Sequence, residues 1–217
     1  MNVGLLPAKP LRLAKTRLGA LLSPDDRMAV GRAMFEDVLA ALSGARALAA
    51  VVVVTADPGL AERARAAGAL VCDEGAPRGL NGAVTLGTAA AIRLGATAVL
   101  VALSDVPLLA PADVDDLIQR APERGALLVP SKEGTGTNAL YRRPAAAFPT
   151  AFGGRSLERH AAAARQRQLA CRIVRNARIG FDVDTPGDLL ALAAVESPTA
   201  TYREILRLGL APLRPVA

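Results

Sequence analysis

The chain has few aromatic residues and almost no histidine or cysteine. Phe, Trp and Tyr make up 3% of its 217 residues, there is no tryptophan, and His160 is the single histidine. Cys72 and Cys171 lie far apart and form no C-x-x-C motif, so together with one histidine they cannot build a zinc site. We expect both to be free thiols. Without aromatics interleaved among its basic residues, the chain also lacks the pattern of a single-strand nucleic-acid binder.

A long hydrophobic run is missing as well. The most apolar stretch, Ala47 to Thr55, is much shorter than the ~20 residues that a membrane-spanning helix needs. The apolar run at the start is too short for a signal peptide, and Pro7 and Lys9 interrupt it. We therefore expect a cytoplasmic protein that does not act at a membrane.

The formal net charge is +6 and the isoelectric point is about 10.1. Such a charge suits either an anionic small-molecule substrate or a nucleic acid. Most of the excess is arginine scattered along expected helices, with no run of five or more basic residues. This distribution favours a small anionic substrate and no nucleic-acid partner.

Short apolar runs alternate with longer stretches of helical character, which predicts an α/β fold with a doubly wound, mostly parallel sheet. With few aromatics, its core must consist of Val, Leu, Ile and Ala. The region from Ala126 to Phe152 is more broken and can add an antiparallel excursion. No repeat or linker is visible, so we expect residues 1–217 to form a single domain. The expected strands are Val3–Leu6, Val51–Val54, Ala69–Cys72, Ala98–Leu103, Leu127–Val129, Ala139–Tyr141 and Arg172–Val174.

Helix starts are marked by residues whose side chains can cap a first turn. Such residues precede or open the expected helices at Ser23, Asp57, Asn81, Ser156 and Thr185. In doubly wound sheets the ligand lies beyond the carboxyl ends of the strands. The loops after Leu6, Leu103 and Phe181 are therefore the places to look for a site.

The loop after the first strand, Pro7–Leu18, contains four basic residues, among them Lys9, Lys15 and Arg17. Fixed cations at the end of a strand neutralise a triphosphate and the charge that develops on leaving pyrophosphate. The loop is not a Walker A motif, because the pattern G-x-x-x-x-G-K is absent. From the residues alone, a solvated basic loop is the competing, less favoured interpretation.

Three aspartates follow expected strands. Asp105 stands just after Leu103, and Asp182 and Asp184 alternate, so in an extended segment they point to the same side. Carboxylates in such places bind magnesium, although an aspartate can also serve only as a turn or helix cap. Both interpretations stay open at this point.

Two further segments are suited to anions. The first, Gly134–Leu140, has small residues whose backbone N–H groups are accessible. The second, Phe152–His160, has a glycine turn that leads into a helix start. Ser156 and His160 are four residues apart and share a helix face. His160 can carry a proton, but a hydrogen-bonded structural role fits it better.

Six of these segments, taken in order, resemble the phospholactate and phosphoenolpyruvate guanylyltransferases that make the deazaflavin coenzyme F-420. Their layout is that of GT-A-like nucleotidyltransferases (the nucleotide-diphospho-sugar transferase type). The resemblance covers nearly the whole chain. The matching pieces are P-A-K-x(5)-K-T-R-L at Pro7–Leu18, G-L-N at Gly79–Asn81, S-D-V-P-L-L at Ser104–Leu109, G-T-N-A-L at Gly136–Leu140, F-G-x-x-S-x-x-x-H at Phe152–His160 and D-V-D-T-P-x-D-L at Asp182–Leu189.

The resemblance implies that GMP is transferred from GTP to a small phosphorylated acid, with pyrophosphate released. The acid is phosphoenolpyruvate, 2-phospho-L-lactate or 3-phosphoglycerate. The implied roles are as follows: Mg²⁺ at Asp105, Asp182 and Asp184; the triphosphate at Lys9, Lys15 and Arg17; the nucleoside at Asn81; the acceptor at Thr137 or Asn138, Gly153 and Ser156. Lys9, Lys15 and Asp105 are the expected catalytic residues. No residue is indicated as the reader of guanine.

Two alternatives stay open. A molybdenum-cofactor or sugar-phosphate nucleotidyltransferase usually has a glycine-rich loop after the first strand, which Pro7–Leu18 lacks. A nonenzymatic nucleotide-binding module would not need the aspartate pair. The sequence also leaves a monomer and a homodimer equally possible.

Overall fold

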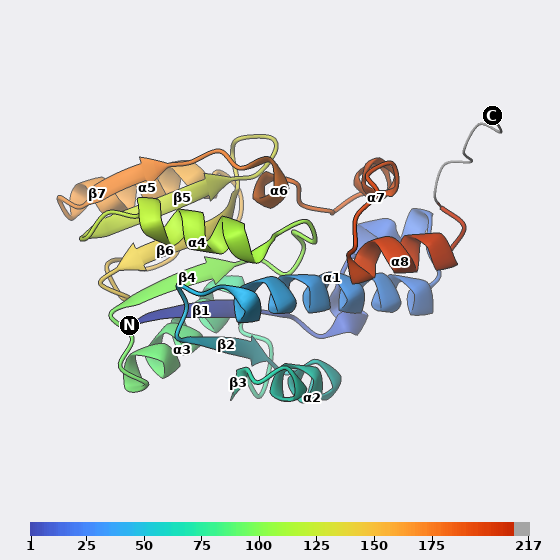
Figure 1. Ribbon diagram of the computed structural model, residues 1–217, viewed down its shortest axis with the longest axis horizontal. Coiled ribbons are helices and arrows are strands. Elements are labelled where there is room, and N and C mark those ends of the chain that lie inside the picture. Colours follow the sequence, from blue (N-terminus) through green and yellow to red (C-terminus); the bar gives the residue numbers. More distant parts are fainter. Residues whose placement is uncertain (211–217) are drawn as a thin grey trace.

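A single seven-stranded sheet forms the centre of the computed structural model, which describes residues 1–210 (Figure 1). The strands lie in the order β3-β2-β1-β4-β6-β5-β7. All neighbours are parallel except β6, which runs antiparallel to both β4 and β5. The predicted α/β class and the antiparallel excursion are both confirmed. The strands are β1 Asn2–Pro7, β2 Ala50–Thr55, β3 Leu70–Asp73, β4 Ala98–Ala102, β5 Gly125–Pro130, β6 Thr137–Arg143 and β7 Ala170–Ile173.

The helices between the strands begin largely where capping residues predict. The side chains of Ser23, Asp57 and Thr185 each accept a hydrogen bond from a backbone N–H in the first turn of the helix that follows. The α-helices are α1 Pro24–Gly44, α2 Pro58–Ala66, α3 Gly79–Arg93, α4 Pro111–Arg120, α5 Ser156–Gln166, α6 Ala177–Gly180, α7 Pro186–Ala193 and α8 Ala200–Arg207. Two short 3-10 turns, η1 Leu11–Leu13 and η2 Thr16–Ala20, follow β1.

Two predicted caps are wrong. Helix α3 begins at Gly79, two residues before Asn81, and α5 has Ser156 as its first helical residue, with Arg155 in the capping position. The side chain of Asn81 instead binds the backbone of Phe152. The short helix α6 was not anticipated from the sequence.

Helices cover both faces of the sheet (Figure 1). Buried side chains of α1, α2 and α4 form one core cluster with one face, and those of α3 and α5 form a second cluster with the other. At Gly87, α3 lies so close to the sheet that an added Cβ would be 2.3 Å from a methyl carbon of Leu5. An added Cβ would therefore have to displace the side chains of Leu5 and Val54.

A third cluster fixes the C-terminal helices against the start of α1. Val183, Leu189 and Ile205 pack there against Leu18 and Met34. The Asp37 carboxylate on α1 accepts hydrogen bonds from the backbone N–H groups of Ala200 and Thr201, at 2.6 and 2.9 Å. The segment before α7 is thereby held beside the loop that follows β1.

The carboxyl ends of β1, β2, β3 and β4 lie at one edge of the sheet, since these strands are parallel. The antiparallel β6 begins at the same edge, because Ala102 at the end of β4 pairs with Ala139. Loops from distant parts of the chain therefore meet there. Among residues 1–210, no helix is long and apolar enough to cross a membrane.

Candidate active site

The basic loop after β1 folds back over the end of the sheet. The backbone N–H of Leu11 donates to Asp57, which also caps α2, so one carboxylate ties the loop to the next helix. Lys15 adopts a left-handed backbone conformation with φ of 51°. Such a conformation costs a residue other than glycine about 1–3 kcal/mol and persists only where surrounding contacts enforce it.

The side chain of Lys15 lies between two carboxylates. The Nζ atom of Lys15 lies 2.9 Å from Oδ2 of Asp105 and 2.9 Å from Oδ1 of Asp184. The lysine side chain is only 9% exposed. Burial by itself lowers the pKa of Lys15, but the charges of Asp105 and Asp184 outweigh it and raise the pKa above the ordinary value. The ammonium group is therefore a fixed cation at this edge of the sheet.

A cavity of about 280 Å³ opens beside this ion-pair cluster. Lys9, Lys15 and Arg17 line it together with Asp105 and Asp184. The Oδ1 atom of Asp105 is buried and has no hydrogen-bond partner among the described residues. A buried carboxylate oxygen without a donor is costly, so it marks a place where a bound cation or donor would be stabilising.

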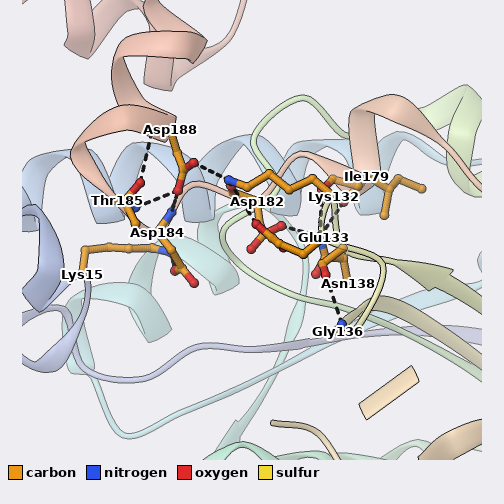
Figure 2. A network of polar contacts seen from close by, with 12 residues as sticks. Lys15, Lys132, Glu133, Gly136, Asn138, Ile179, Asp182, Asp184, Thr185 and Asp188 are labelled. Carbon is orange, nitrogen blue, oxygen red and sulfur yellow. Dashed lines mark hydrogen bonds and ion pairs between the residues drawn. The ribbon is translucent and has the colours of Figure 1, made fainter. Parts of the chain in front are cut away.

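Asp182 is held in place by a different residue, Asn138. Its Oδ1 atom accepts a hydrogen bond of 3.0 Å from Nδ2 of Asn138, which also donates to the carbonyl of Ile179 (Figure 2). Burial, followed by the nearby charge of Asp105, raises the pKa of Asp182 above the usual value for aspartate. Asn138 is buried and thus positions the segment that carries both aspartates.

Lys132 and Asp188 extend this network (Figure 2). The Asp188 carboxylate pairs with Lys132 and accepts hydrogen bonds from the backbone N–H groups of Asp184 and Thr185, at 3.0 and 2.8 Å. Although burial opposes it, hydrogen bonding from Lys132 and these N–H groups lowers the pKa of Asp188 to about 2. Lys132 also donates to the carbonyl oxygen of Asp182 at 3.1 Å.

Sequence analysis missed Lys132 and Asp188 as residues of the site. Asp188 had a recognisable local signal, because Thr185 and Asp188 form a capping box. Nothing local connects Lys132 with Asp188, which lies on a segment far away in the sequence. Their pairing depends on the tertiary fold.

A second cluster surrounds His160, which is fully buried on α5. Its Nε2 atom accepts a hydrogen bond from the backbone N–H of Ala151, and Nδ1 lies 3.1 Å from the hydroxyl of Thr137. The ring proton is therefore on Nδ1 and is donated to Thr137. Burial, helped by Arg142 and Arg159, lowers the pKa of His160 to about 4. The imidazole is neutral near pH 7, which supports the structural interpretation over that of a proton carrier.

The hydroxyl of Thr137 consequently keeps its own proton for another acceptor. Ser156 lies one turn before His160 on α5 and is also buried. Gly153 precedes this helix with φ of 109°, a conformation that favours glycine, and its carbonyl accepts from the N–H of Ser156 at 3.0 Å. Arg155, at the N-cap, makes no capping bond through its side chain. Thr137, Gly153 and Ser156 thus gather near the start of a helix, where anions bind favourably.

Asn81 joins α3 to the second cluster. Its Nδ2 atom donates to the carbonyl of Phe152, and its Oδ1 atom accepts from the N–H of the same residue at 2.8 Å. The amide therefore braces the turn before Gly153. A nucleoside contact by Asn81 stays a prediction; the second N–H of this amide and the second lone pair of its Oδ1 atom are left for it.

The two candidate acceptor contacts on β6 are neighbours in the sequence but belong to different clusters. Thr137 and Asn138 point to opposite faces of β6, one toward His160 and the other toward Asp182. Thr137 lies in the cluster with Ser156, while Asn138 supports the aspartates. The fold therefore brings the predicted residues to one edge of the sheet as two adjoining clusters.

The three aspartates do not form a ready-made metal cage. Among the described residues, no group of three His, Cys, Asp or Glu side chains is arranged to hold a metal ion. Lys15 stands between Asp105 and Asp184, where it supplies positive charge, and Asp182 is turned toward Asn138. The unpartnered Oδ1 of Asp105 and the hard oxygen donors nevertheless suit a divalent cation.

Comparison with known proteins identifies a matching family and relatives of similar sequence. Residues 1–212 match the model of the family described as guanylyl transferase CofC like. The phosphoenolpyruvate guanylyltransferase of Sphaerobacter thermophilus is 40% identical over 192 residues, 88% of this chain and 92% of that protein. The 3-phospho-D-glycerate guanylyltransferase of Phenylobacterium zucineum is 38% identical over 83% of this chain and 84% of that protein.

Solved structures show the same fold. A protein of Desulfovibrio desulfuricans, provisionally assigned as a nucleotide-diphospho-sugar transferase, superposes with a TM-score of 0.77 and 20% identity. The match covers 95% of this chain and 96% of that one. The predicted nucleotidyltransferase type of fold is thus confirmed.

Proposed function

The chain belongs to the guanylyl transferase family described as CofC like, and on this premise we propose its reaction. It transfers GMP from GTP to the phosphate of a small phosphorylated carboxylic acid and releases pyrophosphate. Phosphoenolpyruvate is the foremost acceptor, and 2-phospho-L-lactate and 3-phospho-D-glycerate are the others to test. The product serves coenzyme F-420 biosynthesis. The observation that carries the proposal is Lys15 held between Asp105 and Asp184 in a cavity that Lys9 and Arg17 also line.

The reaction needs no general base. A phosphate monoester has a second pKa near 6, so the acceptor is largely a dianion at neutral pH. One of its oxygen atoms attacks the α-phosphorus of GTP, and the bond from this phosphorus to the oxygen that bridges to the β-phosphorus breaks. Pyrophosphate leaves with that electron pair. The neutral, buried His160 fits this scheme, because no proton has to be removed from the nucleophile.

Positive charge is the main contribution of the protein. Lys9, Lys15 and Arg17 face the cavity and would neutralise the triphosphate and the charge that grows on the departing pyrophosphate. Lys15 is already fixed and largely desolvated, so little reorganisation is needed when the nucleotide binds.

A divalent metal ion, which nucleotidyltransferases of this kind generally use, would add to these cations. We propose Mg²⁺, with Asp105, Asp182 and Asp184 as its protein ligands. When bound, it would supply Lewis-acid stabilisation of phosphoryl oxygen charge. Asn138 and Asp188 hold the backbone and side chains of the two later aspartates in place for this role.

The acceptor would occupy the cluster around His160. Thr137 and Ser156 supply hydroxyl donors, and Gly153 allows the backbone to approach the anion closely. Because His160 donates to the oxygen of Thr137, the threonine proton is directed away from the ring. We assign the acceptor contact to Thr137 and a supporting role to its neighbour Asn138.

Small anionic substrates account for the net charge of +6 without a nucleic-acid partner. A cytoplasmic location and a single domain spanning residues 1–217 belong to the same proposal. So does a homodimer, which size-exclusion chromatography with light scattering would test.

A pyrophosphate-release assay tests the proposal. Purified protein, Mg²⁺ and GTP are combined with each of the three acids, and the products are identified by mass spectrometry. We expect release that depends on one of the acids, together with a product in which GMP is joined to it. Asp105→Asn should lower turnover by about 100-fold or more, as expected for a main electrostatic contributor. Release with none of the acids would refute the proposal, and near wild-type turnover of Asp105→Asn would refute the metal assignment.

A further inference from the structure

A second cavity, also about 280 Å³, adjoins the cationic one and contains a single unexplained carboxylate. The two cavities share Ala8, Lys9, Ser104 and Asp105, so they lie on either side of the loop after β1. Apart from Lys9, Ser104 and Asp105, the second cavity is lined mainly by apolar residues. They include Leu13, Pro77, Leu80, Ala83 and Leu103, and the remaining charged side chain is that of Glu74.

Glu74 is buried in a loop that is otherwise open to solvent. It is 5% exposed, whereas the loop residues on both sides of it, from Asp73 to Gly79, are exposed. Its Oε1 atom accepts one hydrogen bond, of 2.7 Å, from the backbone N–H of Arg78. Within residues 1–210, no lysine or arginine forms an ion pair with Glu74. The carboxylate therefore keeps spare acceptor capacity, which hydrogen-bond donors of a ligand in this cavity can use.

The position of this cavity fixes which part of a nucleotide can reach it. Under the proposed function, the triphosphate occupies the first cavity, which Lys9, Lys15 and Arg17 line. A nucleotide that extends past Lys9 would place its base between the apolar walls of the second cavity. Flat apolar surfaces with a few well-placed polar groups are typical of such pockets.

A carboxylate distinguishes the four bases by their donors. Guanine presents two adjacent donors, its ring N–H and its exocyclic amino group, and a carboxylate can accept both. Adenine and cytosine place a ring acceptor beside their amino group, and uracil flanks its single N–H with carbonyl oxygens. These acceptors would be repelled by the negative charge, which provides discrimination against the wrong base.

We propose that Glu74 is the guanine-selecting residue, with its carboxylate accepting hydrogen bonds from the ring N–H and the amino group of the base. This assignment rests on the proposed function and deepens it, because it explains why GTP is the nucleotide donor. Lys9 lies between the two cavities and marks the passage from base to phosphates.

Nucleotide analogues test the proposal on the wild-type protein. Binding of GTP, ITP and GTP methylated on the ring nitrogen is measured by calorimetry without an acceptor acid. ITP lacks the amino group, and the methylated analogue lacks the ring N–H. Each should bind about 10- to 100-fold more weakly than GTP, as expected for losing a hydrogen bond to a charged group. The matched control is 7-deaza-GTP, which keeps both donors and should bind like GTP. Equal affinity for all four would overturn the assignment.

The variant Glu74→Gln provides a second test. Its side-chain carbonyl can still accept from Arg78, so the turn is retained, while its amide N–H₂ faces the base as a donor. We expect affinity for GTP to fall about 10- to 100-fold, and affinity for XTP, whose base carries a carbonyl in place of the amino group, to rise relative to GTP. The control Asp73→Asn changes an exposed carboxylate in the same loop and should leave the ratio unchanged. A purely structural role of Glu74 would weaken both nucleotides equally.

The outcomes separate this inference from the proposed reaction. If the protein binds GTP in a Glu74-dependent way but transfers GMP to none of the acids, the proposed reaction fails and the guanine assignment stands. If transfer occurs and Glu74→Gln keeps the wild-type preference for GTP over XTP, the assignment alone fails. No detectable binding of any nucleotide would overturn both.

Discussion

The buried imidazole of His160 makes the stability of this protein sensitive to mild acid. The folded protein lowers the pKa of His160 to about 4, compared with about 6.5 in an unfolded chain. Below pH 6.5 the unfolded chain therefore gains a proton that the folded protein binds only near pH 4. Stability is lost as the pH falls through this window, because the unfolded state binds more protons.

The size of this loss follows from the two pKa values. Between pH 7.5 and pH 5, linkage gives a decrease of about 2 kcal/mol in the free energy of unfolding from this one group. A neutral substitute that retains hydrogen-bonding capacity, His160→Gln, removes the titration. The variant should be less stable than the wild type at pH 7.5, but it should lose about 2 kcal/mol less on acidification.

Urea unfolding followed by far-ultraviolet circular dichroism at both pH values measures this difference, and the method suits a chain without tryptophan. Other titrating groups, such as Asp37 with its raised pKa, are common to both proteins and cancel. If wild type and variant lost the same stability between the two pH values, His160 would not be held neutral by the fold. The hydrogen-bond assignment at Thr137 would then be wrong.

Three further predictions concern the two clusters. In Lys15→Met the carboxylates of Asp105 and Asp184 lose their shared cation, so turnover should fall about 100-fold or more. Added Mg²⁺ should raise the melting temperature of this variant more than that of the wild type. An unchanged response to Mg²⁺ would argue against metal binding at these carboxylates. Asp188→Asn weakens the capping box and the pair with Lys132, so urea unfolding should show a decrease of about 1–2 kcal/mol in the free energy of unfolding. No decrease would show that the pair does not stabilise the fold. Ser156→Ala should raise the Michaelis constant for the acid more than that for GTP, and equal effects on both would remove Ser156 from the acceptor site.

Local signals in the sequence were sufficient for most of the framework. Proline and capping residues located the starts of α1, α2 and α7, because these signals act within one turn of the chain. The buried strands were visible as apolar runs, such as Val51–Val54 in β2. Alternation of strands and helices then gave the fold class.

Signals failed where a tertiary contact competes for the same side chain. Asn81 was expected to cap α3, but its amide binds the backbone of Phe152, which is far away in the sequence. The propensity of a capping residue is a weak preference that such a contact overrides. At α5 the boundary is shifted by one residue: Arg155 takes the N-cap position in a left-handed conformation, and Ser156 becomes the first helical residue.

The distinction between local signals and tertiary contacts also applies to the site. Lys9, Lys15 and Asp105 were predicted because they follow strands β1 and β4, whose ends lie at one edge of the sheet. Asp182 and Asp184 were predicted from their alternation in an extended segment. The pairing of Lys15 with two of these carboxylates joins segments that are far apart in the sequence, so no local signal reveals it. Lys132 and Glu74 were missed because only their neighbours in the folded chain single them out: Asp188 beside Lys132, and the second cavity beside Glu74.

The most direct test of the central claim is the bonding of the product. Phosphorus-31 NMR of a reaction containing the protein, GTP, Mg²⁺ and phosphoenolpyruvate distinguishes transfer to the acid from hydrolysis. Transfer predicts the loss of the phosphomonoester signal of the acid and the growth of two mutually coupled diphosphate signals alongside pyrophosphate. An unchanged phosphoenolpyruvate signal, with free GMP as the only new nucleotide, would contradict the account.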